Sequence, residues 1–230
     1  MPDVDHDQRH PHRSLLKQML SERNQYQERA AEIDAAIEEK FGRRVAILAL
    51  DMCGFSRLTV KYGIIHFLAM VHQMEQAAGP AVEANCGTVI KQEADNLFAI
   101  FPEPVQALEA ARDIFRAFEA MNAVLPEGRD IFGSIGIGYG DCLVVGNEDV
   151  FGNEMNLACK LGEDLAAKME ILLTNAAFEA LPPDRYVLTP DAFTISGLDL
   201  NCHRFVKPTF LCGDEPAGGS AVTASPPVLL

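Results

Sequence analysis

The sequence has little that marks an exported, membrane-spanning or zinc-binding protein. Its longest apolar runs, residues 45–50 and 64–70, fall short of the ~18 residues that a membrane span needs. The polar start MPDVDHDQRHPHR has no apolar signal-peptide core, and the 6 cysteines form no Cys-x-x-Cys pair. We therefore expect a cytoplasmic protein with reduced thiols and no membrane span.

Positively charged residues are also scarce. The 230 residues include 19 Lys and Arg against 33 Asp and Glu, which gives a formal net charge of -14. Because nucleic acids are densely negative, this balance argues against a general nucleic-acid binder, although it leaves room for a local pocket for one phosphate group. Hydrophobic residues make up 48% of the chain, which is ordinary for a folded globular protein.

The two ends of the chain differ from the middle. Residues 1–13 and 213–230 are polar or rich in Gly, Ala, Ser and Pro, and we predict disordered tails there. Residues 14–41 contain no Gly or Pro and predict an N-terminal helix. Its alternating three- and four-residue spacing involves Leu16, Met19, Arg23, Tyr26, Ala30, Ile33 and Ile37. Two interpretations stay open: a parallel coiled coil that joins two copies, or one amphipathic helix lying on its own domain.

Residues 42–212 predict one domain of alternating strands and helices. The predicted elements are, in order, a buried strand 45–51, a helix 58–85 with a break near Gly63, two hairpin strands 87–91 and 96–101, a helix 104–124, two strands 131–139 and 142–145 around a Gly140–Asp141 turn, and a helix 152–168. This order is typical of an α+β, ferredoxin-like split βαβ fold. In that fold the third strand lies between the first and second, antiparallel to both.

The predicted strand order brings two acids together. Asp51 ends the first strand and Asp95 opens the third, so their carboxylates meet at one edge of the sheet. Two carboxylates ~4 Å apart repel by ~4 kcal/mol at an effective dielectric of about 20, and a divalent cation removes that repulsion. Hard oxygen ligands suit Mg²⁺ or Mn²⁺ better than zinc. The alternative is a pair of solvated acids at strand ends.

A turn into the next helix follows Asp51. Cys53, Gly54, Phe55 and Ser56 form this turn, and a glycine-containing turn at a helix N-terminus offers backbone N–H groups to phosphate. Together with the two acids, the turn predicts a site for a metal ion and a polyphosphate.

Further polar residues lie downstream. Asp149 precedes a helix in which Asn156 and Lys160 are four residues apart and therefore share one face. Lys91 lies near the end of a predicted strand. From spacing alone these residues are equally compatible with a plain solvated surface.

Three stretches, ILALDMCGFSRL, GTVIKQEADNLFAIF and GIGYGDCLVVGNEDVFGNEMNLACKLGEDLA, resemble the catalytic domain of class III adenylate and guanylate cyclases. The resemblance covers roughly residues 43–210. The stretches contain no phosphate-loop lysine motif and no dinucleotide glycine fingerprint. The resemblance implies a cyclase homology domain over residues 42–212 that acts as a head-to-tail homodimer. It also implies conversion of ATP to 3′,5′-cyclic AMP and pyrophosphate at the dimer interface, with no nucleic-acid partner.

The family's site residues carry over by position. The resemblance implies that Asp51, Asp95 and the backbone carbonyl of Met52 hold two Mg²⁺ or Mn²⁺ ions in each active site. Lys91 and Asp149 match the residues that recognise the purine, and lysine with aspartate is the adenine-selecting combination. The lysine is suited to donate to adenine N1, and the aspartate is suited to accept from the exocyclic amine.

Two further positions have catalytic counterparts, and one of them departs from the family. Asn156 matches the asparagine that orients the ribose. Lys160 stands where most members have an arginine, so it keeps the charge but lacks the planar fork of donors. No lysine occurs near Ser196, where many members bind the terminal phosphates, and Arg204 and Lys207 are the candidates to replace it.

Ala94 is another departure, since the family has a glycine before the second aspartate. Three functions stay open on these grounds. The first is an active adenylyl cyclase. The second is a nucleotide-binding regulatory domain with weak or no turnover, suggested by Lys160 and the missing lysine. The third is an interaction domain with a ferredoxin-like core.

Overall fold

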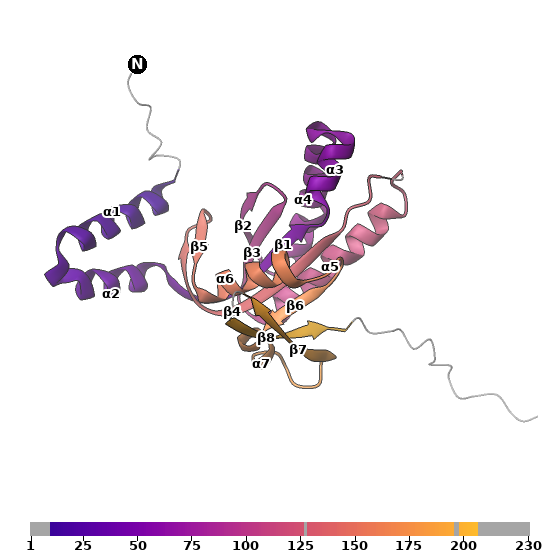
Figure 1. The fold of residues 1–230 in the computed structure, drawn as a ribbon. Helices are drawn as coiled ribbons and strands as arrows, with labels where there is room; N and C mark the ends of the chain where they lie inside the picture. The colour runs from indigo at the N-terminus through magenta and orange to yellow at the C-terminus, as the bar shows by residue number, and fades with distance from the viewer. Residues whose placement is uncertain (1–9, 127, 196–197, 207–230) are drawn as a thin grey trace, which may run out of the picture.

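The structure is a computed structural model that describes residues 10–126, 128–195 and 198–206, without the side chains of residues 55–57, 194–195 and 198–199. An N-terminal pair of helices stands at one end of a domain built on a single sheet (Figure 1). The N-terminal elements are α1 (Pro11–Gln25), η1 (Gln27–Arg29) and α2 (Ala30–Phe41). The domain comprises β1 (Gly42–Met52), α3 (Phe55–Tyr62), α4 (Ile64–Ala84), β2 (Thr88–Glu93), β3 (Asn96–Phe101), α5 (Pro104–Asn122), β4 (Gly133–Val145), β5 (Asp149–Phe151), α6 (Asn153–Cys159), the π-helical turn η2 (Lys160–Leu165), β6 (Ile171–Thr174), α7 (Asn175–Glu179), β7 (Leu188–Ile195) and β8 (Leu198–Phe205).

The strand order confirms the predicted α+β, ferredoxin-like core. Within the described ranges the sheet runs β2-β3-β1-β4-β6-β8-β7, and β5 pairs with β4. β3 lies between β1 and β2 and is antiparallel to both. The predicted break near Gly63 separates α3 from α4. Gly63 has a φ of 86°, which favours glycine, so the helix ends there and begins again.

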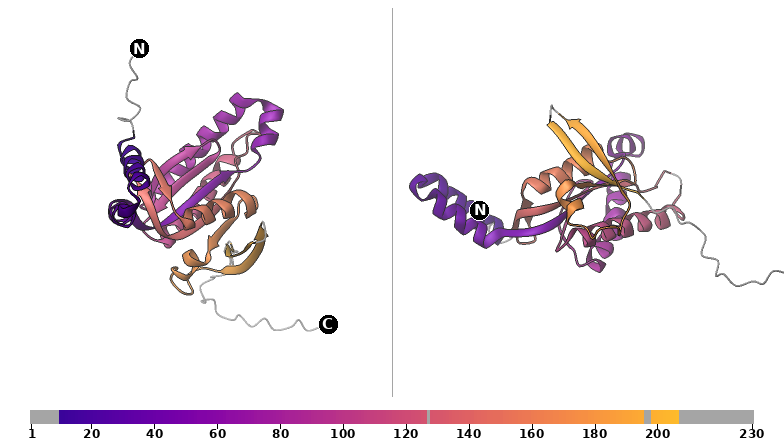
Figure 2. Two further views of the ribbon diagram at one scale, coloured as in Figure 1. Left: turned by 60° about the vertical axis from the view of Figure 1, so that its left-hand side comes forward. Right: turned by 90° about the horizontal axis from the view of Figure 1, so that it is seen from below.

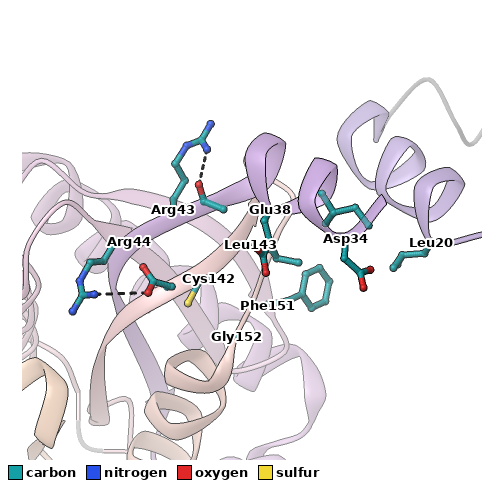
Figure 3. Close-up of a pocket in the computed structure, with 12 residues that line it drawn as sticks. Leu20, Asp34, Glu38, Arg43, Arg44, Cys142, Leu143, Phe151 and Gly152 are labelled. Atoms are coloured by element: carbon teal, nitrogen blue, oxygen red, sulfur yellow. Dashed lines mark hydrogen bonds and ion pairs between the residues drawn. The ribbon is translucent and has the colours of Figure 1, made fainter. Parts of the chain in front are cut away.

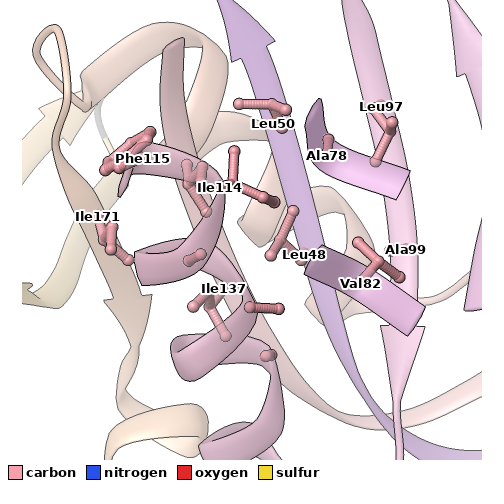
Figure 4. Close-up of a cluster of buried hydrophobic side chains, with 14 of the residues drawn as sticks. Leu48, Leu50, Ala78, Val82, Leu97, Ala99, Ile114, Phe115, Ile137 and Ile171 are labelled. Carbon is pink, nitrogen blue, oxygen red and sulfur yellow. The ribbon is translucent and has the colours of Figure 1, made fainter. Parts of the chain in front are cut away.

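The two faces of the sheet bury alternate residues of β1. Leu48 and Leu50 belong to the cluster that α4 and α5 complete, with Ile114 of α5 and Val82 of α4 among their neighbours (Figure 4). Ile47, on the other face, packs in a second cluster with residues of α6 and β5. Because a fully buried Leu or Ile side chain stabilises a fold by about 1.5–3 kcal/mol, this continuous apolar strand holds both layers.

The predicted turn at Gly140–Asp141 is wrong. β4 is one strand through this point, and Gly140 pairs with Val45 of β1. The glycines serve a different purpose, because a Cβ at Gly136 would lie 2.0 Å from the carbonyl oxygen of Ala158, and one at Gly138 would lie 2.5 Å from that of Glu154. Glycine at these positions lets α6 approach the sheet closely.

The predicted N-terminal helix is present, but it is divided into two helices and is not continuous over residues 14–41. The chain bends at Tyr26, and α1 and α2 form a helical hairpin that projects from one end of the domain (Figures 1 and 2). The hairpin begins at Pro11, inside the segment predicted as a tail. Residues 1–9 and 213–230, where we predicted disordered tails, lie outside the described residues.

The three- and four-residue spacing marks the inner side of this hairpin. Leu16, Ile33 and Ile37 are buried in one cluster with Val145 of β4. Arg23, the charged interruption, forms an ion pair of 2.5 Å with a carboxylate of α2, that of Asp34. These three apolar positions therefore pack within one chain, whereas Tyr26 of the same spacing is 40% exposed, and a coiled coil between copies stays a prediction.

Candidate active site

Asp51 and Asp95 lie at the same edge of the sheet, as the strand order predicts. Asp51 is in register with Asn96, the first residue of β3, and the Met52 N–H donates to the Asp95 carbonyl oxygen at 3.1 Å. Since side chains alternate along a strand, the Asp51 side chain lies on the face of Ile47, which α6 covers. The Met52 side chain is buried, so only its backbone is available to a ligand.

Negative charge gathers around Asp51. Burial, followed by the charges of Asp95, Glu163 and Asp164, raises the pKa of Asp51 to about 7. Burial, followed by the charges of Asp164 and Asp95, also raises the pKa of Glu163. We did not predict Glu163 and Asp164 as neighbours of this edge, because no spacing rule relates the π-helical turn η2 to β1.

The turn after Asp51 is held by the backbone. The Cys53 N–H donates to the Phe132 carbonyl oxygen at 2.8 Å, and Gly54, the N-cap residue before α3, has a left-handed φ of 95°. Phe55 and Ser56 provide the first backbone turn of α3. The first N–H groups of a helix have no partner within it, so this turn presents donors beside the two aspartates.

One cation near this turn was not predicted. The Lys168 ammonium lies 3.1 Å from the centroid of the Phe132 ring, and it opposes the rise that burial causes in the pKa of the Cys53 thiol. No motif marks Lys168 in the sequence, since only the fold brings the loop before β6 to the end of β1.

Lys91 and Asp149, which the family resemblance implies as the purine pair, are in direct contact. The Lys91 Nζ lies 3.1 Å from the Asp149 Oδ1 and 3.1 Å from a carboxylate oxygen of Glu93. Burial acts to raise the pKa of Asp149, but hydrogen bonds from Lys91, from Arg13 and from the Val150 N–H outweigh it and lower that pKa overall. Only 5% of Asp149 is exposed.

Asn156 and Lys160 lie on the outer side of α6 and at the start of η2. Both are exposed, whereas Met155 and Ala158 of α6 are buried against the sheet. The four-residue spacing therefore separates a polar outer side from an apolar inner side. An incoming molecule has access to both polar side chains.

Arg204 is engaged elsewhere. Its guanidinium forms ion pairs with Glu170 and, at 2.5 Å, with Asp191, so it is not available as the terminal-phosphate cation. Ser196 and Lys207 lie outside the described residues. Ala94, in the turn before Asp95, has a left-handed φ of 52° that an L side chain rarely adopts.

The ligands available at Asp51 fit a hard divalent cation. Two carboxylates and the Met52 backbone carbonyl are oxygen ligands of the kind that Mg²⁺ and Mn²⁺ prefer. A bound cation would offset the negative charge that raises the pKa of Asp51. In the described part of the chain, no three His, Cys, Asp or Glu side chains are arranged to hold a metal ion on their own. The fit therefore depends on Asp51, Asp95 and backbone oxygen.

Solved structures define the class of fold. The adenylate/guanylate cyclase/hydrolase from Silicibacter pomeroyi matches with a TM-score of 0.60 and 24% identity, over 73% of this chain and 98% of that chain. Other adenylyl and guanylyl cyclase domains match similarly. The chain has the fold of the class III adenylyl and guanylyl cyclase catalytic domain.

Curated relatives are named for the adenylyl activity. The Rhizobium meliloti (strain 1021) protein named "Putative adenylate cyclase 3" is 32% identical over 125 residues, which are 54% of this chain and 21% of that protein. The Streptomyces coelicolor protein named "Adenylate cyclase" is 29% identical over 144 residues, which are 63% of this chain and 36% of that protein. The matches thus span about a fifth to a third of these relatives. No family model matches the chain. None of the helices in the described ranges is long and apolar enough to cross a membrane.

Proposed function

We propose that this chain is an adenylyl cyclase domain that converts ATP to 3′,5′-cyclic AMP and pyrophosphate at the interface of a homodimer. The observation that carries the proposal is the contact of 3.1 Å between Lys91 and Asp149, an adenine-selecting combination, in a fold shared with solved cyclases. The sequence similarity to proteins named adenylate cyclase supports the same activity.

The purine pair recognises adenine through complementary hydrogen bonds. The Lys91 ammonium donates to adenine N1, and the Asp149 carboxylate accepts from the exocyclic amine. Guanine has an N–H where adenine has N1 and a carbonyl oxygen where adenine has the exocyclic amine. The same pair is therefore mismatched to GTP.

Asp51, Asp95 and the Met52 carbonyl are the groups that would hold two Mg²⁺ or Mn²⁺ ions. Bound there, the ions would lower the pKa of the ribose 3′-hydroxyl and neutralise the triphosphate. Every group that sets the pKa of Asp51 raises it, and none of these groups is a cationic side chain that could take the place of a metal ion.

The chain's other groups position the substrate. The Cys53 N–H is engaged by the Phe132 carbonyl oxygen, so the N–H groups of Gly54, Phe55 and Ser56 bind phosphate oxygens. Asn156 orients the ribose. The ribose 3′-oxygen, having lost its proton, attacks the α-phosphorus in line, and the bond to the bridging oxygen of pyrophosphate breaks. Lys160 stabilises charge on the α-phosphate; a lost contact of this kind costs up to ~3–4 kcal/mol.

A second copy of the chain completes the site. Asp51 and Asp95 come from one copy. The purine pair, Asn156 and Lys160 come from the other copy, in which Asn156 and Lys160 are exposed. α3 and α4, which follow the phosphate-binding turn, carry an exposed apolar surface. That surface comprises Val60 (89% exposed), Ile64 (53%), Ile65 (81%) and Leu68 (57%). Exposed groups of large apolar side chains mark protein contacts, and we assign this surface to the second copy.

The test is product formation by the isolated chain. Incubation with ATP and Mn²⁺ is expected to yield cyclic AMP, with GTP as the matched competitor, and sedimentation measures the dimer. Absence of product across metals and pH values contradicts an active cyclase.

The regulatory alternative, suggested by Lys160, predicts that ATP with Mg²⁺ raises the melting temperature by mass action without turnover. An interaction domain predicts no change in melting temperature with ATP and Mg²⁺.

A further inference from the structure

The N-terminal hairpin reaches the purine pair. The Arg13 Nη2 in the first turns of α1 donates to the Asp149 Oδ2 at 2.5 Å, across 136 positions of sequence. Arg13 is partly exposed, with 37% of its side chain accessible, whereas the Asp149 side chain is 8% accessible. An element outside the sheet therefore contacts the carboxylate that the proposed function assigns to adenine.

The residue before Asp149 holds the same helix. The Glu148 carboxylate accepts from the backbone N–H groups of His12, at 3.3 Å, and of Arg13, at 3.0 Å. These N–H groups belong to the first turn of α1, where the helix provides no acceptor and the helix dipole favours a negative charge. The turn between β4 and β5 thus binds α1 through two adjacent acids.

The hydrogen bonds of Asp149 leave little for a ligand. Oδ1 accepts from the Lys91 ammonium and from the Val150 N–H, and Oδ2 accepts from Arg13. A carboxylate accepts about four hydrogen bonds in all, and only 5% of this residue is exposed. Three hydrogen bonds are therefore in use, and the remaining acceptor position lies on Oδ2 beside the Arg13 guanidinium, so an amine of a purine competes with Arg13 there.

We propose that Arg13 is a specificity-site gate: its contact with Asp149 closes the purine-recognising carboxylate, and nucleotide binding requires α1 to withdraw. The inference rests on the proposed function of Asp149. The position of the helical hairpin then controls the affinity for nucleotide. A partner or an adjoining segment that holds α1 away from Asp149 raises that affinity.

The seat of the hairpin permits such a movement. Its apolar contact with the domain is a narrow cluster around Leu16, Ile33, Ile37, Phe41 and Val145. Beside that cluster a pocket of about 840 Å³ lies between the hairpin and β4–β5 (Figure 3). Leu20 from α1 and Phe151 from β5 line the pocket and stay 42% and 45% exposed. The hairpin therefore contacts the domain through one buried apolar cluster, with an open pocket beside it.

The test compares Arg13→Gln with Arg116→Gln, which removes an arginine from an Arg–Asp pair on α5 away from the site. The ligand is 3′-deoxy-ATP with Mn²⁺, which lacks the hydroxyl needed for cyclisation, and calorimetry gives its Kd. We expect Arg13→Gln to bind roughly fivefold more tightly than the wild type, the scale of a partly exposed ion pair, and Arg116→Gln to match the wild type. Arg13→Lys, which keeps a donor at Asp149, is expected to bind with an affinity between those of the wild type and Arg13→Gln.

Hydrogen exchange without nucleotide provides a second readout. Arg13→Gln is expected to exchange the amides of residues 12–16 faster than the wild type, because the contact that holds α1 is weakened. Equal Kd values for the wild type and Arg13→Gln overturn the gate alone, and weaker binding by Arg13→Gln overturns it in favour of a role for Arg13 in supporting Asp149. If neither protein binds 3′-deoxy-ATP, the proposed function fails and the gate fails with it.

Discussion

Asp51 and Asp149 are both aspartates at strand ends of one sheet, yet their surroundings are opposite. Asp51 is half-buried and crowded by Asp95, Glu163 and Asp164, and burial together with these charges raises its pKa to about 7. Asp149 receives Lys91 and Arg13, and its pKa is lowered. Among the described residues, the charges that set the pKa of Asp51 are all negative, so a bound cation would stabilise it, whereas Asp149 is already paired and a ligand would compete with its partners. An added positive charge would therefore stabilise the Asp51 end of the proposed site, whereas the Asp149 end already has its positive partners.

The largest expected effect comes from removing the charge at the crowded end. Asp51→Asn is expected to reduce cyclic AMP formation by at least ~100-fold, since a metal ligand is lost, and to abolish stabilisation by Mn²⁺. Turnover assays and thermal melts with and without Mn²⁺ measure both effects. Asp141→Asn, an exposed carboxylate on β4, is the matched control and should behave as the wild type. Retained turnover in Asp51→Asn would break the assignment of the crowded end as the metal site.

The paired end should control which nucleotide is used. Replacing Lys91 with Glu and Asp149 with Cys together is expected to shift the ratio of kcat/KM for ATP and GTP toward GTP by at least about tenfold, because the hydrogen-bonding groups at the purine are reversed. Steady-state kinetics with both nucleotides measures the ratio. Glu93→Gln, which removes an exposed neighbour of Lys91, is the control and should leave the ratio unchanged. An unaltered preference for ATP in the double variant would mean that these residues do not recognise the purine.

A smaller effect concerns stability in the absence of metal. The folded Asp51 carboxyl keeps its proton up to a pH of about 7, whereas the unfolded chain releases it near pH 4, so the folded state binds more protons between these values. Stability therefore falls as pH rises through this window, by about 1–2 kcal/mol once solvent screening is allowed for. Urea unfolding at pH 5 and pH 8 in chelator measures the slope, and Asp51→Asn should flatten it. Equal slopes in the two proteins would contradict crowding at Asp51.

The smallest expected effect lies in the turn before Asp95. Ala94 adopts a φ of 52°, which costs an L residue about 1–2 kcal/mol, so Ala94→Gly should stabilise the chain by about 1 kcal/mol. Thermal or urea unfolding measures the change. Ala123→Gly is the control, because Ala123 has a φ of -64° and gains nothing from glycine. A loss of stability in Ala94→Gly would show that the turn is not strained.

Sequence reasoning succeeded where local pattern and topology rules act together. The apolar run of β1, the break at Gly63 and the proline that begins α5 follow from side-chain periodicity and backbone restriction. The meeting of Asp51 with Asp95 follows from the strand order of the split βαβ unit. Sequence reasoning failed at Gly140, because glycine in a strand and glycine in a turn have the same local pattern. Only the approach of Glu154 on α6 distinguishes the two.

By itself, the sequence determined which residues are apolar on one side, where strands end in acids, and hence the fold and the position of the aspartates. Only the tertiary structure decided what covers each apolar side: Leu16, Ile33 and Ile37 pack on one another and on Val145. It also decided the contact of Arg13 with Asp149 and the approach of Glu163 to Asp51. Periodicity indicates that an apolar surface needs a partner, and a charged residue indicates the sign of charge that its partner carries. Which distant residue becomes the partner depends on how the elements pack in three dimensions.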